Sequence, residues 1–330
     1  MDARQRFLET LLYGSPDRLP RLEEGIRDEV RLAWERQGLP PQADLAGVFG
    51  YDLREEQELD LDPRPRLRRW PASRKELKEF QRRLNAQDSR RLPAGWPERI
   101  AEWRSRSQPL ILRVQRGFFL SMGVEDWRRF HTVITLTKDD PVMVAELLRL
   151  QGELSASLVE RVLGAVSVDA ALFSEPIGGN HGPLISPRMY AELVLPSYQP
   201  ILAVLKAHQV PLIIARTYAN PRPLLPLLVE AGVNCLWAVE APPREMDYRQ
   251  LRQEFGRELR LIGGIDTDAL REGEAAIRKA VEQVAGLAED GGFIPLLDGR
   301  VREEVSYADY LVYRKLLEEL TSSSHPSPLR

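Results

Sequence analysis

The stretch 210-VPLIIARTYANPRPLLPLLVEAGVN-234 contains a predicted strand and helix and leads into a second strand. Its apolar opening, Val210–Ile214, predicts a buried strand, and the apolar run Val233–Val239 predicts a second one. The proline-punctuated segment between them, which begins near Pro223, predicts a helix. Strand, helix and strand at this spacing are typical of a βα unit in a parallel sheet.

The same alternation continues on both sides of this stretch. Strand-type apolar runs occur at Pro109–Gly117, Val166–Ser174, Val210–Ala215, Val233–Val239, Leu259–Ile265 and Gly292–Leu297. Leu19–Glu23 and Leu67–Trp70 are weaker strand candidates. Eight strands connected by helices predict an α/β fold of the (β/α)8 TIM-barrel type, and a doubly wound open sheet is the alternative.

Helical patterns separate the strands and also decorate the N-terminal part. They are predicted at Ile26–Gln37, Ser73–Asn85, Pro141–Leu163, Ser186–His208, Asp247–Leu259 and from Thr267 to about Ala288. We therefore expect a single domain at 1–320, with helical decoration within 1–108 and the main barrel at 109–320. The polar stretch TSSSHPSPLR, residues 321–330, predicts a disordered tail.

Composition narrows the classes of partner. The chain has 330 residues, and its hydrophobic content of 43% suffices for a large core. A net charge of −3, with both signs mixed, argues against a nucleic-acid partner. The basic cluster Pro63–Trp70 is too local to change that, and we interpret it as a solvated edge. Because neither a leader nor a membrane-length apolar run is found, we expect a cytoplasmic protein without a membrane partner.

Cysteine and histidine usage speaks against a metal site. The single cysteine, Cys235, lies in the apolar run VNCLWAV and excludes a disulfide framework and an all-cysteine metal site. The four histidines are His131, His181, His208 and His325, and none is paired at i+2 or i+4 with another strong ligand. We therefore expect neither a bound metal nor a cofactor.

Ionisable residues follow every strong strand, where a parallel barrel forms its active site. They are Arg116, Glu175, Arg216, Tyr218, Glu240, Asp266, Asp298 and Arg300. Any one of them alone is also explained by a loop that reaches water or by a helix cap, and Asp266 in particular could cap a helix that begins at Thr267. Six strands with the same ending favour a shared cleft.

The arginines in this set predict an anionic ligand. The planar forks of Arg116, Arg216 and Arg300 suit the bidentate capture of a carboxylate or a phosphate. Arg216 and Tyr218 are two residues apart, so both face the same side of an extended backbone. We predict that these four residues bind the substrate.

The carboxylates predict proton transfer or the stabilisation of a cationic intermediate. We assign this catalytic role to Glu175, Asp266 and Asp298 and place Glu240 among the substrate-binding residues. His181, in a glycine-rich loop, is either a general acid or a donor that anchors the loop. Glycoside hydrolysis by the pair Glu175 and Glu240 is an alternative that fits a barrel.

Several longer phrases resemble the uroporphyrinogen decarboxylase superfamily. They are RFLETLLYGSPDRLPRLEEG at 6–25, NHGPLISPRMYAELVLPSYQPILAVLKAHQVPLI at 180–213, PLLPLLVEAGVNCLWAVE at 223–240, LRLIGGIDTDAL at 259–270 and GGFIPLLDGRVREEVSYADYLVYRKLL at 291–317. The resemblance implies a TIM barrel and one of two chemistries. One branch removes acetate carboxyl groups from a tetrapyrrole held by arginines, and the other transfers methyl groups from a corrinoid protein to a thiol activated by zinc.

The chain departs from both patterns. Decarboxylases carry an Arg-Gln-Ala-Gly-Arg phrase near the N-terminus, where this chain reads RLEEGIRDEVRLAWERQG at 21–38. Arg216 and Tyr218 stand where the methyltransferases carry His-x-Cys, which leaves zinc without ligands there. Uncharacterised relatives often carry Asp-x-Asp at that place, and Asp-His where this chain has Asp298–Gly299.

Three functions are consistent with these observations. The first is an enzyme that acts on an anionic small molecule, with tetrapyrrole decarboxylation as the candidate reaction. The second is a relative of the corrinoid-dependent methyltransferases that works without zinc and needs a separate corrinoid protein as its partner. The third is a ligand-binding relative without catalysis. The family resemblance also allows a homodimer.

Overall fold

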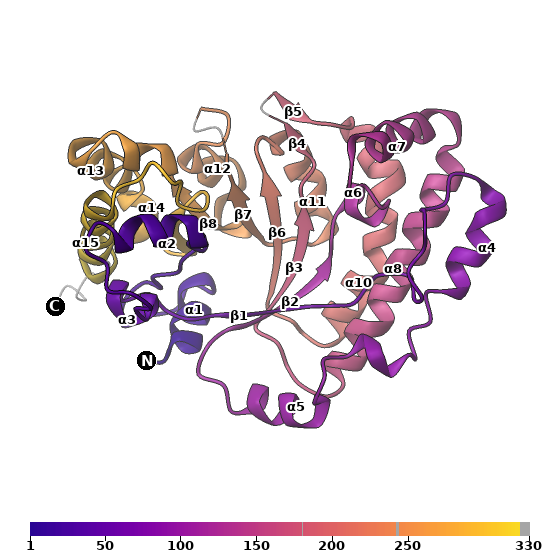
Figure 1. Ribbon diagram of the computed structural model, residues 1–330, viewed down its shortest axis with the longest axis horizontal. Helices are drawn as coiled ribbons and strands as arrows, with labels where there is room; N and C mark the ends of the chain where they lie inside the picture. The colour runs from indigo at the N-terminus through magenta and orange to yellow at the C-terminus, as the bar shows by residue number, and fades with distance from the viewer. Residues whose placement is uncertain (180, 242–243, 324–330) are drawn as a thin grey trace. The chain divides into compact units, whose positions relative to one another are not determined.

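The structure is a computed structural model that describes residues 1–179, 181–241 and 244–323. The chain divides into two compact units (Figure 1). The terminal unit consists of Met1–Glu55, Ser107–Pro109 and Asn234–Arg330, and the central unit consists of Glu56–Arg106 and Leu110–Val233.

Parallel strands form the centre of the central unit. They are β2 (Leu110–Gln115), β3 (Ala170–Glu175) and β6 (Leu212–Tyr218). β3 pairs with both neighbours, and β1 (Glu55–Glu58) lies beside β2. β2 and β3 are buried along their whole length, apart from one half-buried residue in β2, because helices cover them.

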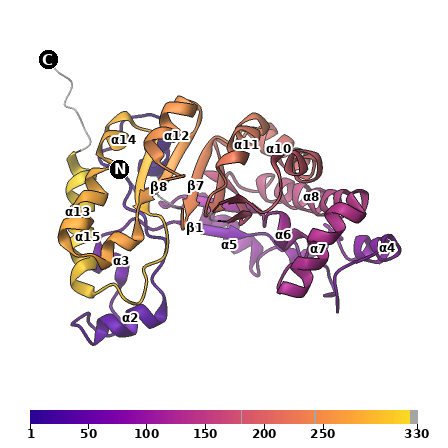
Figure 2. The same cartoon turned by 90° about the horizontal axis from the view of Figure 1, so that it is seen from above.

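Two helices of the central unit pack closely beside each other, α8 (Pro141–Leu163) and α10 (Leu195–Ala207) (Figure 2). The α8 helix begins with Pro141 at its first position, and the Asp140 carboxylate caps it by accepting the backbone N–H of Met143. Gly152 permits the close approach of the two helices, because a Cβ there would lie 2.1 Å from the backbone oxygen of Ser197.

The remaining helices of the central unit surround this layer. They are α4 (Arg74–Arg82), α5 (Trp96–Arg104), α6 (Phe118–Ser121), α7 (Trp127–Asp139), α9 (Pro187–Met189) and α11 (Leu225–Ala231). A short hairpin of β4 (Gly178–Gly179) and β5 (Gly182–Pro183) follows β3.

The terminal unit contains three further parallel strands. They are β7 (Cys235–Val239), β8 (Arg260–Ile265) and β9 (Phe293–Leu297), with β8 in the middle. The helices of this part are α12 (Tyr248–Phe255), α13 (Glu274–Glu282), α14 (Ala285–Asp290) and α15 (Tyr307–Ser323). Helices α13 and α15 pack against each other.

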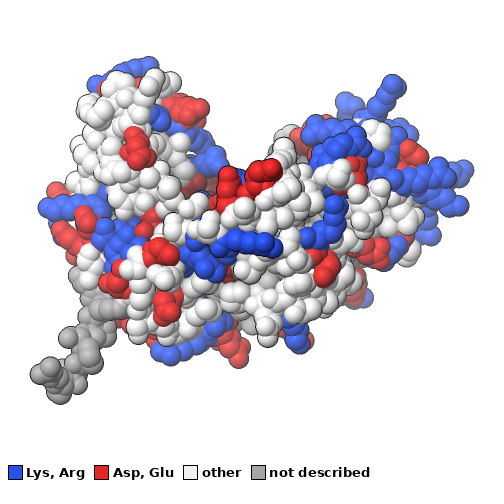
Figure 3. Space-filling model, turned by 90° about the horizontal axis from the view of Figure 1, so that it is seen from below, with Lys and Arg blue, Asp and Glu red and all other residues white. Residues whose placement is uncertain are grey.

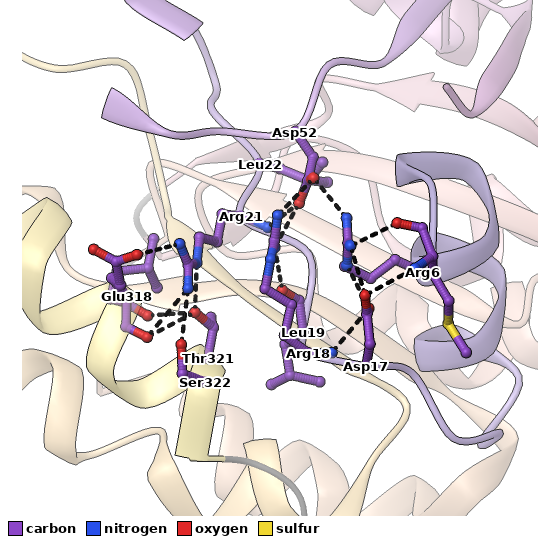
Figure 4. Close-up of polar contacts among 12 residues, drawn as sticks. Arg6, Asp17, Arg18, Leu19, Arg21, Leu22, Asp52, Glu318, Thr321 and Ser322 are labelled. Carbon is purple, nitrogen blue, oxygen red and sulfur yellow. Dashed lines mark hydrogen bonds and ion pairs between the residues drawn. The ribbon is translucent and has the colours of Figure 1, made fainter. Parts of the chain in front are cut away.

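The N-terminal segment of the terminal unit is held by arginines. It contains α1 (Ala3–Leu11), α2 (Asp28–Glu35) and α3 (Leu45–Phe49). Figure 4 shows Arg6 between Asp17 and Asp52, at 2.8 and 2.9 Å. Arg21 donates to Glu318 at 2.7 Å and to Thr321 at 2.8 Å, which fastens the segment to α15.

Most predicted elements are confirmed. All six strong strands form, and the capping box predicted for Ser73 and Glu76 is present at the start of α4. Leu19–Glu23 and Leu67–Trp70 are not strands, so these two predictions are wrong. The helix predicted from Thr267 to Ala288 is divided into a 3-10 turn, α13 and α14, because Gly273 and Val284 interrupt it.

The C-terminal helix extends into the segment predicted as a tail. The tail predicted at 321–330 begins inside α15, which continues to Ser323, and 324–330 lie outside the described residues. Among the helices that the structure describes, none combines the length and the apolar character needed to span a membrane.

Candidate functional site

Asp298 is a buried carboxyl at the end of β9. Its Oδ1 accepts the backbone N–H of Thr267 at 3.0 Å and the Thr267 hydroxyl at 2.9 Å. The residue is 8% exposed. The pKa of this carboxyl is raised to about 6, chiefly by burial and in smaller part by the charges of Asp266 and Asp268, against the lowering effect of the Thr267 hydrogen bonds.

Asp266 and Glu240 lie beside Asp298. Asp266 accepts the backbone N–H of Asp268 at 2.9 Å and caps the following 3-10 turn, so the predicted cap is confirmed. Glu240 has a left-handed backbone, with φ of 50°, and its N–H donates to the backbone oxygen of Asp298. The structure therefore brings together the three carboxylates predicted at the ends of β7, β8 and β9.

Two of these carboxylates line a cavity of about 480 Å³ in the terminal unit. Asp266 and Asp298 form one part of its wall, and Arg244, Tyr248 and Gln283 contribute to the rest. The Tyr248 hydroxyl is fixed because it donates to the backbone oxygen of Ile262 at 2.8 Å. Within the described part of the chain, Arg244 makes no hydrogen bond or ion pair, so its charge is available to a ligand.

Arg300 follows the same strand as Asp298. Its side chain lies near Gly25, where a Cβ would be 3.7 Å from Nε of Arg300. The residue is exposed, and it too has no ion pair among the described residues.

Glu175 is a fully buried carboxyl in the central unit. It accepts the hydroxyls of Tyr190, at 3.1 Å, and of Tyr198, and the backbone N–H of Phe118 at 3.0 Å. Gly117 allows the last contact, because a Cβ there would lie 2.7 Å from Oε1 of Glu175. Burial raises the pKa of Glu175 to about 7, although the three hydrogen bonds lower it.

A π-helical turn, Tyr190–Val194, brings both tyrosines to this carboxyl. Eight residues of an ideal α-helix would leave Tyr190 and Tyr198 about 80° apart around the axis. The wider π turn reduces that rotation, and the two rings lie 6.5 Å apart beside Glu175. The roles of these two tyrosines were not predicted from the sequence, although their eight-residue spacing after a capped helix start was a possible signal.

Glu175 and Arg216 face opposite sides of the sheet. Phe173 packs on the ring of Tyr198 at 4.9 Å, so Phe173 and Glu175 both face the helix layer. In the register of β3 and β6, Glu175 is opposite Thr217, whereas Ser174 is opposite Arg216. The catalytic role predicted for Glu175 therefore stays a prediction. Its carboxyl group is more deeply buried than its position at a strand end suggested.

Arg216 and Arg116 are each paired with a carboxylate of the central unit. Arg216 makes a bidentate ion pair with Glu56 at 2.7 and 2.9 Å. Arg116 binds Asp62 at 2.6 Å and lies 3.7 Å from Glu58. These partners were missed, although the alternation of acidic residues in EEQELDLD, 55–62, was a usable signal.

The other predicted residues of the central unit make fewer contacts. Tyr218 is half-buried and shares the face of β6 that carries Arg216, as predicted from their spacing. His181 is exposed, directly before β5. In the described ranges no three His, Cys, Asp or Glu side chains are grouped so that they could hold a metal.

Parallel βα units with polar residues after their strands are common to TIM barrels and doubly wound sheets, and the first solved structure described below supports the (β/α)8 TIM-barrel class that the sequence predicted. The family model described as "Uroporphyrinogen decarboxylase (URO-D)" matches residues 122–295, more than half of the chain. The chain therefore belongs to the uroporphyrinogen decarboxylase family. No curated protein matches it in sequence.

Solved structures support the fold assignment. A methyltransferase from Methanosarcina mazei is similar over 97% of this chain and 99% of its own, with a TM-score of 0.60 and 12% identity. A B12-independent methionine synthase from Shewanella sp. W3-18-1, in complex with selenomethionine, has a TM-score of 0.38 and 11% identity over 67% of this chain and 65% of its own. A. niger ochratoxinase has a TM-score of 0.31 and 13% identity, over 69% of this chain and 56% of its own. Of these three, only the first supports the fold.

Proposed function

We propose that this chain is an enzyme of the uroporphyrinogen decarboxylase family that removes a carboxyl group from an anionic small molecule, with Asp298 as the proton donor. The observation that carries the proposal is the buried Asp298 carboxyl, which has a pKa raised to about 6 and lines a cavity. Close to pH 6, half of the molecules hold this group in the neutral form that can donate a proton.

The cavity supplies the other groups that such a reaction needs. Arg244 offers a guanidinium that no described carboxylate neutralises, and it suits a substrate carboxylate. Asp266, beside Asp298, places a second carboxyl group in the cavity wall, where it can stabilise a cationic intermediate. Arg300 is a second cation of the same unit that is open to an anionic ligand.

The proposed reaction converts R–CH2–COO⁻ and one proton into R–CH3 and CO2. Neutral Asp298 protonates an electron-rich ring carbon, such as that of a pyrrole, and a cation forms. The C–C bond to the carboxylate then breaks, and its electron pair neutralises the cation as CO2 leaves. The exocyclic carbon takes up a proton from solvent, and the ring proton returns to Asp298.

Arg116 and Arg216 enter this proposal in a conditional role. Both are paired with carboxylates of the central unit, so they can bind a substrate carboxylate only in exchange for Asp62 or Glu56. Tyr218 and His181 remain proposed hydrogen-bond donors, and Glu240 remains a proposed binding residue.

Turnover of a uroporphyrinogen-type tetrapyrrole, followed by mass spectrometry, tests the proposal. We expect the wild type to lose CO2 units and Asp298→Asn to lose at least about 99% of that activity. The substitution keeps the shape of the side chain, and its Oδ1 can still accept from Thr267. Glu274→Gln, an exposed carboxylate in an ion pair with Arg278, is the matched control. Wild-type protein that leaves the substrate mass unchanged would refute the proposal.

Methyl transfer is a second candidate, supported by the name and the fold of the Methanosarcina mazei relative. It would require a separate corrinoid protein. A change in the absorbance of a methyl-corrinoid on mixing with this protein and a thiol would favour it. Tight tetrapyrrole binding without any chemical change would instead favour the third candidate, a ligand-binding relative.

A further inference from the structure

A strongly basic surface covers one side of the central unit. Residues 64–91 contain eleven Lys and Arg but only three Asp and Glu, a net charge of +8 in a chain whose total is −3. Figure 3 shows Lys and Arg gathered on the side of this unit where Figure 1 places α4. The exposed cations that define this basic surface are Arg66, Arg68, Arg69, Arg74, Lys75, Lys78, Arg82 and Arg90.

Hydrogen bonds from two arginines to backbone oxygens hold the segment that carries these charges. The Arg91 side chain is fully buried and donates to the backbone oxygens of Asp60, Asp62 and Arg83, each at 2.8 Å. Arg83 in turn donates to the backbone oxygens of Pro65, at 2.8 Å, and Arg66. The hydrogen bonds of Arg91 and Arg83 therefore hold the backbone of residues 60–66 in place, and this fixes the positions of the exposed cations on it.

Five of the eight exposed cations are weakly paired or unpaired among the described residues, whereas Arg69, Arg74 and Arg90 form ion pairs with Glu76, Asp140 and Asp88 at 2.7, 2.8 and 2.6 Å. Arg66 lies 3.5 Å from Asp62 and Arg82 lies 3.8 Å from Glu79, both as exposed pairs. Such pairs are screened by water and exchange readily. Arg68, Lys75 and Lys78 form no ion pair with any residue that the structure describes. The basic surface therefore keeps positive charge that no described carboxylate neutralises.

Two hollows give this surface relief. One, of about 500 Å³, is lined by Arg66, Arg68, Arg69, Lys75, Arg83, Glu76 and Glu79, together with Pro65, Leu67 and Pro71. The other, of about 420 Å³, is lined by Arg64, Arg66, Arg90, Asp60 and Asp62, together with Pro63 and Pro65. Arg66 and Pro65 border both, so the hollows adjoin and can accept an extended segment.

We propose that the basic surface docks an acidic segment of a partner protein. Arginine forks match the carboxylates of Asp and Glu in bidentate geometry, and an acidic segment complements the charge of this surface. Pro63–Trp70 was interpreted from the sequence as a solvated edge. The buried Arg91 that holds this segment and the two adjoining hollows are not expected of a solvated edge, so we replace that interpretation.

The same observations disfavour a nucleic acid. Glu76, Glu79, Asp60 and Asp62 line the hollows between the arginines, so the cations do not form the continuous track that a phosphate backbone follows. Trp70, the aromatic residue of the cluster, packs on Phe80 at 5.3 Å and against Gly123, so its ring is not presented for base stacking. Discrete carboxylates of a protein segment can enter the arginine forks between these acidic residues.

A fluorescent poly-glutamate peptide is the probe for this proposal, and its anisotropy on titration with the full chain is the measurement. The test variant is Arg66→Gln/Arg69→Gln/Arg82→Gln, whose side chains are 87%, 81% and 78% exposed. The control variant, Arg149→Gln/Arg188→Gln/Arg278→Gln, removes the same charge from i,i+4 ion pairs elsewhere. Thermal unfolding of all three proteins verifies that they fold alike.

We expect the test variant to lose about tenfold in affinity and the control to stay within about twofold of wild type, with binding weakened by salt. Equal losses in the two variants, or no wild-type binding at low salt, would overturn the proposal. So would tighter binding of a single-stranded DNA of matched charge, which would assign the surface to nucleic acid. Self-association that the test variant alone abolishes, measured by sedimentation, would assign it to a second copy of this chain.

Discussion

Replacing Glu175 with Gln should remove a large part of the pH dependence of stability. The carboxyl has a pKa of about 7 in the folded protein against an ordinary value of 4.5, chiefly because it is buried. The folded state therefore binds more protons than the unfolded state between these two values. Stability due to this group is fully present below about pH 4.5 and is lost as pH rises through 7.

The size of the effect follows from the shift. A pKa raised from 4.5 to about 7 corresponds to about 3 kcal/mol lost by the wild type between pH 4.5 and pH 8. The Gln variant carries no titrating group at this position, so its unfolding free energy should lack this decline. Its side-chain oxygen can still accept from Tyr198 or from the Phe118 N–H.

Urea unfolding followed by tryptophan fluorescence at pH 5, 6, 7 and 8 measures the effect. The difference between wild type and variant isolates Glu175, because every other titrating group is shared. Tyr198→Phe removes a hydrogen bond that lowers the pKa of Glu175, so it should extend the decline to higher pH and increase the total loss of stability. Parallel pH profiles for wild type and Glu175→Gln would show that the buried carboxyl does not titrate as reasoned.

Three further predictions concern other parts of the molecule. Glu56→Gln should destabilise the protein by about 3 kcal/mol, because the largely buried Arg216 loses its bidentate ion pair with Glu56. The double variant Glu56→Gln/Arg216→Met should recover most of this loss when both proteins are unfolded in urea. Gly152→Ala should cost about 2 kcal/mol or more, because its Cβ would meet a backbone oxygen of α10. Gly286→Ala, with open space around the new methyl group, should be neutral or stabilising by thermal unfolding, and a similar loss in both would contradict the packing argument. Decarboxylation should fall about tenfold per pH unit above pH 6 as Asp298 ionises, and a rate that rises there would exclude this group as the acid.

The strands could be predicted because each is a run of apolar residues between turn residues. Because such a run is apolar on both faces, however, the sequence does not show which face of the strand contacts the helices. In β3, every residue from Ala170 to Glu175 is buried, so no alternation of polar and apolar residues marks the helix side. For this reason the sequence predicted Glu175 among the strand-end residues, and its hydrogen bonds with Tyr190 and Tyr198 show that it faces the helix layer.

The strand β1 could not be predicted, because the segment Glu55–Glu58, with the sequence EEQE, has no apolar face. Its Glu56 gains its partner from Arg216, 160 residues away, and no local pattern encodes such a distance. Asp266 is the opposite case. Its cap was predictable, since the carboxylate and the N–H that it accepts are two residues apart.

The position of β1 changes what the predicted arginines can do. An anionic substrate that approached Arg216 or Arg116 would meet a guanidinium already bound to Glu56 or Asp62, and it would have to displace a carboxylate of the same chemical kind. Arg244 and Arg300 present no such competitor among the described residues. We therefore expect a carboxylate to bind more favourably at these two cations of the terminal unit, which also contains Asp298 with its raised pKa. In the function proposed above, binding and proton donation are therefore assigned to residues after β7 and β9, and the two paired arginines anchor β1 and the loop that follows it.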